Sequence, residues 1–343
     1  MCLLPLSRMK PPRMPSRIEL SGFSAPYASL TGTLALSASH LDLTRAMLTV
    51  GYPSARAAIS VVGQWRAKML QAMIKGYLNQ DLTSTNYYRN LEQSEKVAVS
   101  FLMGQAFTYW FAEKHMHLPF LVHVQGTSGY NCTPSSATTP LKMGAVPTAL
   151  RSRPDFIGFK LGHYHVFESK GRSKRPSNAE RQKALYQASM ISSINGLSPS
   201  TRVACFFVFK ANGVVGIIED PPVSERPFDL YFDTMSAIRK SFAFFLEPFF
   251  QQRAREVRNE FVGIEIDEGL TFAIDKKLLS LLDRDRKDPN KIQAESVLSF
   301  LEERGPMYVL LRDTDLSAGL NGTLLIENRP KPTQNIKKRR ISP

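Results

Sequence analysis

Two carboxylates and a lysine in the middle of the chain have the types and spacing of a hydrolytic site. Asp155 follows Pro154, twelve residues separate it from Glu168, and Lys170 stands two residues after Glu168. We expect the two carboxylates to lie in adjacent strands of one hairpin and to approach each other closely. Side chains alternate along a strand, so Lys170 should share a face with Glu168, while Ser169 faces away and offers its carbonyl. Two carboxylates, a carbonyl and water form the hard oxygen set that Mg²⁺ prefers.

The same residues resemble a known signature. The order P-D, a dozen residues, then E-S-K is similar to the motif of the PD-(D/E)XK phosphodiesterases, which include restriction endonucleases and RecB-like nucleases. The resemblance implies that Asp155, Glu168 and the Ser169 carbonyl bind Mg²⁺, for which Mn²⁺ would substitute. It also implies that Lys170 orients or activates the attacking water. The reaction would be phosphodiester hydrolysis, in which the metal lowers the pKa of its water and neutralises phosphate charge.

A second match lies downstream of the motif. Gln182 and Tyr186 have the spacing Q-x-x-x-Y that RecB-like members carry on the helix after the motif. Residues four apart lie on one helical face, roughly 40° from each other on the wheel. The resemblance implies that this pair supports the active site or the DNA, with Tyr186 partly buried and its hydroxyl directed toward Lys170 or the metal. The alternative is a surface glutamine beside a core tyrosine.

The superfamily often carries an acidic residue in its first core helix. Gln105 stands near the expected place here, and Glu95 and Glu113 are further candidates. A glutamine would coordinate a metal only through its amide oxygen.

Positive charge predicts a polyanionic partner. Lys and Arg outnumber Asp and Glu by 44 to 30, which gives a formal net charge of +14. Cations that meet phosphates release condensed counterions, so such a surplus favours nucleic acid, with DNA expected and RNA left open. Five basic residues follow the motif directly and are predicted to contact the DNA backbone, with a solvated loop as the alternative: Arg172, Lys174, Arg175, Arg181 and Lys183.

Other signals exclude several classes of protein. The three cysteines, Cys2, Cys132 and Cys205, form no CxxC pair, so neither a disulfide framework nor a structural zinc site is predicted. No apolar run is long enough to span a membrane, and a cytoplasmic location is expected. His163 and His165 flank Tyr164 beside the motif. Metal ligation or general-base work is open to them, although a surface hairpin turn is the more frequent setting.

The elements needed to position these residues follow from hydrophobic periodicity. Residues 1–40 lack a period and predict a flexible arm, and residues 41–90 predict a helical region in which Trp65, Met69 and Met73 share a buried face. Residues 91–222 predict the nuclease-like core. It begins with a helix over 92–117, whose apolar stripe includes Val97, Phe101 and Trp110 and in which Gly104 allows the close approach of another element. A strand over 118–124 and a loop over 126–146 follow.

The rest of this core carries the motif. We predict hairpin strands over 155–159 and 164–169, a helix over 178–195 capped by Asn178 and Gly196, and strands over 203–210 and 214–218. The order fits an α/β fold with a restriction-endonuclease-like core, a mixed sheet flanked by helices. An α+β extension follows over 223–328. It is predicted to be mainly helical, with strands around 264–274, 307–311 and 323–326. A basic disordered tail covers 329–343.

Two classes of function remain. The first is a magnesium-dependent DNA endonuclease or exonuclease in restriction, mobile-element or phage-defence systems, acting as a homodimer or with a partner subunit. The second is a catalytically silent DNA-binding or assembly protein that retains the nuclease fold. The three intact residues Asp155, Glu168 and Lys170 favour the enzyme, because a binding module has no need for all of them.

Overall fold

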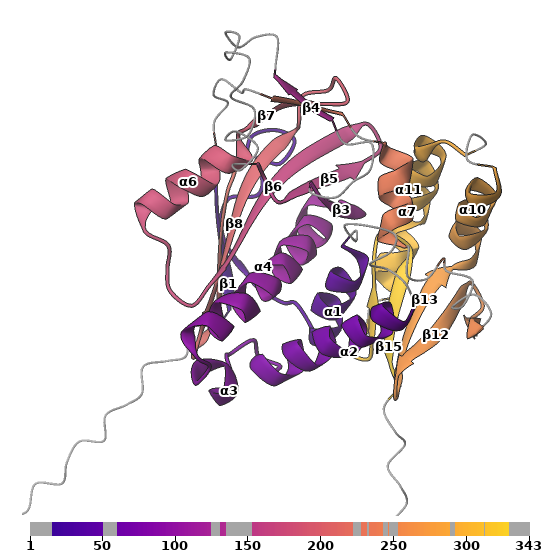
Figure 1. Cartoon of the computed structure of the whole chain (residues 1–343), viewed down its shortest axis with the longest axis horizontal. Helices are drawn as coiled ribbons and strands as arrows, with labels where there is room; N and C mark the ends of the chain where they lie inside the picture. Colours follow the sequence, from indigo (N-terminus) through magenta and orange to yellow (C-terminus); the bar gives the residue numbers. More distant parts are fainter. Residues whose placement is uncertain are drawn as a thin grey trace, which may run out of the picture.

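A seven-stranded mixed sheet forms the centre of the molecule (Figure 1). The computed structural model describes residues 16–50, 60–124, 131–134, 153–221, 228–231, 233–242, 246, 253–288, 292–311 and 313–328. The strand order is β2 (Gly32–Ala35), β1 (Arg17–Ser21), β9 (Gly213–Glu219), β8 (Thr201–Lys210), β6 (His163–Arg172), β5 (Phe156–Lys160) and β3 (Phe120–His123).

The pairing within this sheet confirms the predicted meander. Strands β3, β5 and β6 pair antiparallel, and β8 and β9 form a further antiparallel pair. Between these groups β6 runs parallel to β8, which requires the crossover that the intervening helix provides. Strand β1 pairs with β9 and β2. The prediction of a flexible arm is therefore wrong for residues 16–40, and residues 1–15 lie outside the described residues.

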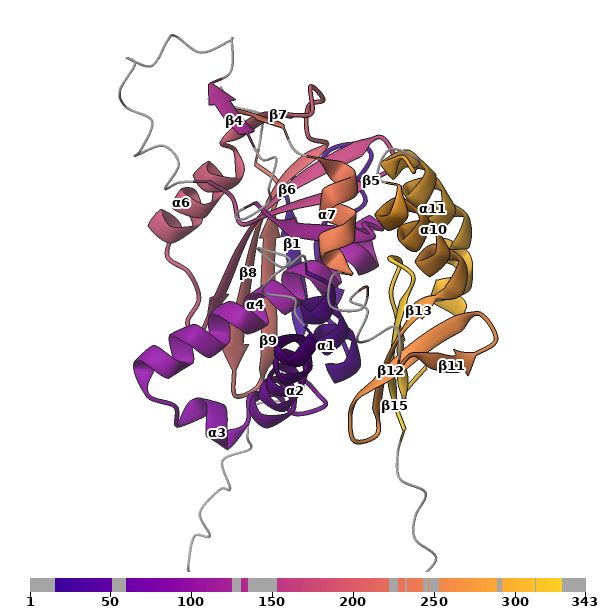
Figure 2. The same cartoon turned by 45° about the vertical axis from the view of Figure 1, so that its right-hand side comes forward.

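Helix α4 (Gln93–Met116) covers one face of the sheet (Figures 1 and 2). Its N-terminus is fixed by a capping box between Glu92 and Glu95, and it ends at His117, which adopts a left-handed conformation with φ of 56°. Gly104 lets the helix approach β6 closely, as predicted. A Cβ on Gly104 would lie 2.6 Å from the Gly171 nitrogen, and one on Gly171 would overlap the Ser100 carbonyl.

Helix α6 (Asn178–Ala188) covers the opposite face. Ala184 packs with Ala204 and Phe206 of β8, whereas the neighbouring residue Cys205 points toward α4. The helix is shorter than predicted because the chain leaves it after Ala188 and forms β7 (Ile191–Ile194). Its N-cap is Ser177, in a capping box with Glu180, rather than Asn178. Gly196 lies in a later turn instead of capping the helix.

A small second sheet contains β7, β10 (Phe228–Tyr231) and β4 (Asn131–Pro134). Strand β4 falls within the segment predicted as a loop, most of which lies outside the described residues. Strand β10 falls within the region predicted as helical. Strand β10 bridges the other two, pairing parallel with β7 and antiparallel with β4. These strands are short, and their pairing depends on contacts that sequence periodicity does not encode.

The helical region before the core is present, with a different buried face from the one predicted. It contains α1 (His40–Thr49), α2 (Ser60–Tyr77) and α3 (Asn86–Arg89). In α2 the buried residues include Leu70, Met73 and Ile74, whereas Trp65 is 66% exposed and Met69 49% exposed.

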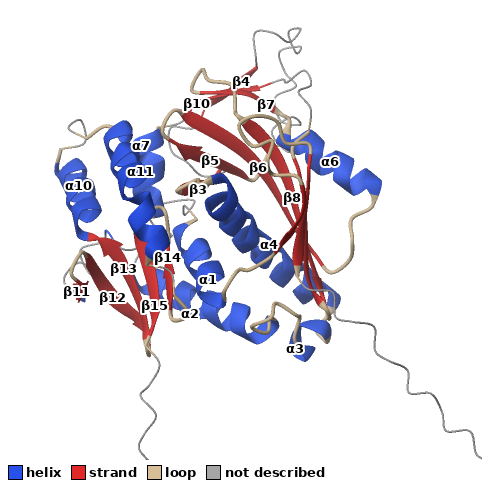
Figure 3. Ribbon diagram, turned by 180° about the vertical axis from the view of Figure 1, so that it is seen from behind, coloured by secondary structure: helices blue, strands red, loops and turns tan. Residues whose placement is uncertain are grey.

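The C-terminal region is an α+β unit, as expected, but it is not mainly helical. A five-stranded sheet contains β11 (Arg255–Arg258), β12 (Phe261–Asp267), β13 (Leu270–Asp275), β15 (Thr323–Glu327) and β14 (Leu316–Ala318). Helices α10 (Lys276–Lys287) and α11 (Ala294–Leu310) pack with it, and α7 (Thr234–Ser241) precedes it (Figure 3). The strand predicted over 307–311 is wrong, because α11 continues through residue 310. The predicted tail over 329–343 lies outside the described residues.

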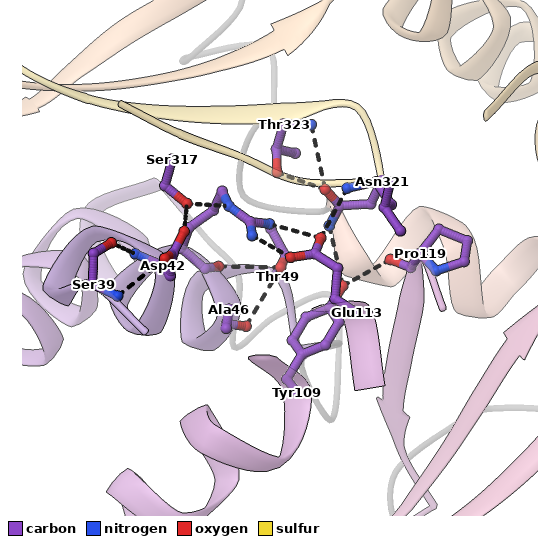
Figure 4. Close-up of polar contacts among 12 residues, drawn as sticks. Ser39, Asp42, Ala46, Thr49, Tyr109, Glu113, Pro119, Ser317, Asn321 and Thr323 are labelled. Atoms are coloured by element: carbon purple, nitrogen blue, oxygen red, sulfur yellow. Dashed lines mark hydrogen bonds and ion pairs between the residues drawn. The ribbon is translucent and has the colours of Figure 1, made fainter. Parts of the chain in front are cut away.

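A buried ion pair joins this C-terminal sheet to the helices (Figure 4). Arg45 of α1 makes a two-pronged contact with Glu113 of α4, and its Nε donates to Ser317 Oγ of β14 at 2.9 Å. The Leu320 backbone nitrogen also donates to Glu113 Oε1, at 2.8 Å. Gly319 leaves room for the guanidinium, since a Cβ there would lie 2.0 Å from Arg45 Nη1. The carboxylate of Glu113 is therefore part of a buried structural ion pair.

Among the described residues, every helix is too short or too polar to cross a membrane.

We predict that Glu113→Ala lowers the free energy of unfolding by about 3–5 kcal/mol, because it leaves the Arg45 charge buried without a partner. Urea unfolding followed by circular dichroism measures this change. The double variant Arg45→Met with Glu113→Leu should recover much of the loss, since apolar side chains of similar volume often replace a buried pair. A loss below about 1 kcal/mol for Glu113→Ala would contradict the structural role of the pair.

Candidate active site

The candidate site lies where β5 and β6 separate. Strand β5 pairs with β6 only as far as Phe167, so that from Glu168 onward β6 keeps β8 on one side and has no β5 residue on the other. Asp155, the residue before β5, occupies this opening. Its backbone nitrogen donates to Glu168 Oε2 at 3.2 Å, and the Ser169 nitrogen donates to Asp155 Oδ2 at 2.9 Å. The structure therefore brings the two predicted carboxylates together.

Lys170 joins them from the same strand. Its ammonium forms an ion pair with Glu168 Oε1, and its side chain is 30% exposed while that of Glu168 is fully buried. Glu168 pairs with Ala204 and Lys170 with Phe206 across the parallel ladder, which places both on the face that α6 covers. The predicted shared face of Glu168 and Lys170 is confirmed.

Ser169 faces the other way, as predicted. Its Oγ accepts a hydrogen bond from Thr108 Oγ1 of α4 at 2.9 Å. In an extended strand the N–H and C=O of one residue project to the same side. Because the Ser169 nitrogen points at Asp155, its carbonyl also faces the open edge. The three groups predicted as oxygen ligands, Asp155, Glu168 and the Ser169 carbonyl, thus border one opening.

The electrostatics of this opening favour a bound cation. Burial and the nearby charge of Asp155 together raise the pKa of Glu168 to about 7, against the opposing effect of Lys170. Burial also raises the pKa of Asp155, which Lys170 and the Ser169 N–H oppose. Apart from Lys170, Glu168 Oε1 has no polar partner among the described residues. Two close carboxylates with one lysine leave negative charge that a divalent ion would neutralise.

No third acidic, histidine or cysteine ligand joins the pair. Within the described parts of the chain, no group of three or more such side chains is placed to hold a metal ion. The residues that could hold a metal ion here are Asp155 and Glu168 with the Ser169 carbonyl, and Mg²⁺ is the ion that takes as few as one or two carboxylates and keeps several waters.

The structure separates the three candidates on α4. Glu95 caps the helix by accepting from the Glu92 nitrogen at 3.3 Å, and Glu113 belongs to the ion pair with Arg45. Gln105 is 4% exposed and lies one turn after Phe101. It neighbours Thr108, the residue that contacts Ser169, although no contact joins Gln105 to either carboxylate among the described residues. Glu95 and Glu113 are therefore assigned to a helix cap and an ion pair, and a supporting role for Gln105 stays a prediction.

The Q-x-x-x-Y pair lies elsewhere than predicted. Gln182 and Tyr186 are both on α6, but both are exposed, Tyr186 by 58%. The buried side of the helix carries Ala184 and Ala188. The Tyr186 hydroxyl makes no hydrogen bond to any described residue, and its expected orientation toward Lys170 stays a prediction. Neither the partly buried tyrosine nor the core tyrosine of the alternative is observed.

The predicted DNA-binding residues divide into two groups. Arg172, Arg175 and Arg181 form ion pairs with Glu180, Glu19 and Glu219. Lys174 and Lys183 are exposed and form no ion pair within the described chain. All five lie between the end of β6 and the first half of α6.

The two histidines beside the motif differ from each other. His163 is exposed at the hairpin turn, whereas His165 is completely buried. Its Nδ1 lies 3.0 Å from Thr201 Oγ1 and its Nε2 lies 3.4 Å from the Tyr27 hydroxyl. His165 is thus a core residue, and the surface setting expected for it is wrong. Burial lowers its pKa to about 3.

Sequence reasoning missed a cleft next to the site. A cavity of about 540 Å³ is lined by Lys170 and the residues after it on one side and by the first half of α4 on the other. Lys96 and Phe101 line the α4 side, and Phe101 is 45% exposed. The signal available in the sequence was a lysine one turn from exposed apolar residues, which the periodicity instead assigned to a buried stripe.

No protein-family model matches this sequence, and neither a curated protein nor a solved structure matches it.

We predict that His165 makes the protein less stable as pH falls. Its folded pKa of about 3 lies below the value of about 6.5 for an unfolded histidine. The stabilisation is fully present above pH 6.5 and is lost as the unfolded state takes up a proton, at about 1.4 kcal/mol per pH unit between pH 6 and pH 4. Urea unfolding across that range gives the slope of the unfolding free energy against pH. For His165→Gln this slope should be smaller by the amount that corresponds to the uptake of about one proton on unfolding. Parallel curves for the two proteins would contradict this assignment.

Proposed function

We propose that this protein is a metal-dependent nuclease that hydrolyses phosphodiester bonds in DNA. The observation that carries the proposal is the opening between β5 and β6, where Asp155, Glu168 and Lys170 converge. Perturbed carboxylates beside a lysine are a frequent mark of catalytic sites. The basic cleft that opens beside Lys170 supports a phosphate-containing substrate.

In this proposal Asp155, Glu168 and the Ser169 carbonyl hold Mg²⁺, with Mn²⁺ as a substitute. When bound, the ion supplies Lewis acidity and a water of lowered pKa. The protein holds its own ligands in place beforehand: the Ser169 N–H fixes Asp155, and the Asp155 N–H fixes Glu168. Such preorganisation means that little rearrangement is needed during the reaction.

Lys170 has the role of orienting the nucleophile. Its ammonium is anchored by Glu168 yet 30% exposed, so it is held in direction while remaining accessible from the cleft. Three N–H donors on one fixed group can position an attacking water and an oxygen of the phosphate. Gln105 lies on the helix behind the site and is the remaining candidate for a supporting contact through its amide.

We expect Lys170→Ala and Asp155→Ala each to reduce cleavage on the order of 100-fold or more, because both act on the reacting groups. Nicking of supercoiled plasmid with Mg²⁺ or Mn²⁺, against an EDTA control, measures the rate. Lys114→Ala removes an equal charge at an exposed position of α4 and should leave the rate unchanged. DNA binding by Lys170→Ala should stay within a few-fold of the starting protein, since affinity comes from many phosphate contacts.

Two results would overturn the proposal. One is an unmodified protein that binds DNA but cuts none with either metal, which would favour the silent DNA-binding alternative. The other is a Lys170→Ala variant that loses binding and cutting equally.

We predict that Tyr186→Phe changes the metal-dependent rate by less than about twofold, because its hydroxyl is exposed and unbonded in the described structure. Single-turnover cleavage, with the melting temperature followed in parallel, tests this. A loss of tenfold at unchanged melting temperature would restore a catalytic role for the Q-x-x-x-Y motif.

A further inference from the structure

Two clefts beside the candidate site together form one basic groove. The first is the cavity of about 540 Å³ that adjoins Lys170, and the second has a volume of about 460 Å³. Lys96, Ser173, Lys174 and Arg175 line both clefts, so the two clefts adjoin each other. We call their combined surface the basic groove. Its path runs from Lys170, past the first turns of α4, to the end of β8.

The charge of this groove is almost entirely positive. Besides the shared cations, the first cleft is lined by Lys170 and Arg172, and the second by Arg89 and Lys210. The single carboxylate in either lining is Glu180, which Arg172 neutralises. Lys174 and Lys210 form no ion pair within the described chain. A surface of this kind attracts a chain of phosphates, because each contact releases counterions.

Apolar side chains interrupt the positive charge on one wall. Val97 is 59% exposed and Phe101 is 45% exposed, and both line the first cleft one helical turn apart. The neighbouring stripe of α4, Ser100 and Gly104, packs against Gly171 and so fixes the wall in place. Exposed apolar groups among cations match a polymer that alternates phosphates with flat apolar faces.

The position of Phe101 distinguishes a single strand from a duplex. Bases in a duplex are stacked on each other and present only their edges, whereas an unpaired strand offers base faces for stacking on an aromatic ring. Phe101 lines the same cleft as Lys96 and Lys170 and is 45% exposed, so its ring is accessible to the face of a base.

We propose that the basic groove binds a single-stranded DNA segment and leads it to the site at Lys170. Its phosphates lie along Lys96, Lys174 and Lys210, and one base stacks on Phe101. Delivery of the strand to a cleavage site rests on the proposed nuclease function, whereas binding of the strand in the groove can be tested without that function.

The experiment measures binding in an Asp155→Ala background, so that a bound strand is not cut. Binding is measured by fluorescence anisotropy with a labelled single strand of about 20 nucleotides, a length that exceeds the span of one binding site. A duplex and an RNA of the same sequence are measured alongside. The test variant is Lys96→Ala, Lys174→Ala and Lys210→Ala combined. Its control combines Lys114→Ala, Lys277→Ala and Lys287→Ala, which removes equal charge at exposed positions away from the groove.

The groove variant should bind the single strand about 10- to 100-fold more weakly near 0.1 M salt, and the control should change little. Its slope of log affinity against log salt should fall by about 2, since each lost contact to a single strand removes about 0.7. Phe101→Ala should weaken single-strand binding at least about 5-fold and leave duplex binding within twofold. Phe101→Tyr should retain affinity, and circular dichroism checks that every variant is folded.

Equal affinities for the groove and control variants would overturn the proposal. So would a duplex bound more tightly than the single strand, or a preference for RNA over DNA. Binding lost in the groove variant of a protein that never nicks DNA would support the groove and reject the nuclease. Nicking that needs Lys170 but is unaffected by the substitutions in the groove variant would support the nuclease and reject the groove.

Discussion

The close approach of α4 to β6 is the contact on which the site and the groove both depend. Gly104 and Gly171 meet backbone to backbone, with no room for a Cβ on either residue. At this distance Thr108 reaches Ser169 and holds the strand at the position where the Ser169 N–H meets Asp155. The same crossing leaves Phe101 and Lys96, on the next stripe of the helix, facing the cleft beside Lys170. A larger side chain at either glycine would move both the wall of the groove and strand β6, which carries Glu168 and Lys170.

The local part of this arrangement could be predicted from the sequence. Alternation along a strand placed Glu168 and Lys170 on one face with Ser169 opposite, and the Gly-containing turn placed Asp155 on the partner strand. Such relations depend only on residues near one another in the chain, and strand geometry has a fixed period. The glycine needed for close helix packing was also identifiable, because few other roles suit a glycine inside a helix.

Relations that depend on distant contacts could not be predicted. Residues 17–21 form a strand because β9 offers them a parallel edge, which no local pattern announces. Val97 and Phe101 continue an apolar stripe, yet they are exposed and line a cleft, whereas Ser100 and Gly104 beside them pack against Gly171 of β6. Tyr186 is exposed since small alanines, rather than the aromatic ring, allow α6 to pack on β8. The remaining errors follow from the same cause, that burial is decided by what packs against a face.

Two buried glutamates, Glu113 and Glu168, have contrasting electrostatic surroundings in this fold. Glu113 accepts from Arg45 and from the Leu320 nitrogen, so its charge is matched by a guanidinium and a backbone donor. Glu168 is equally buried, but it lies beside Asp155 and shares one lysine with it. An apolar residue would fill the same space without the cost of burying repelling charges. Among the described residues Lys170 is the one cation that pairs with Glu168, and this is the observation on which the proposal of a bound divalent ion rests.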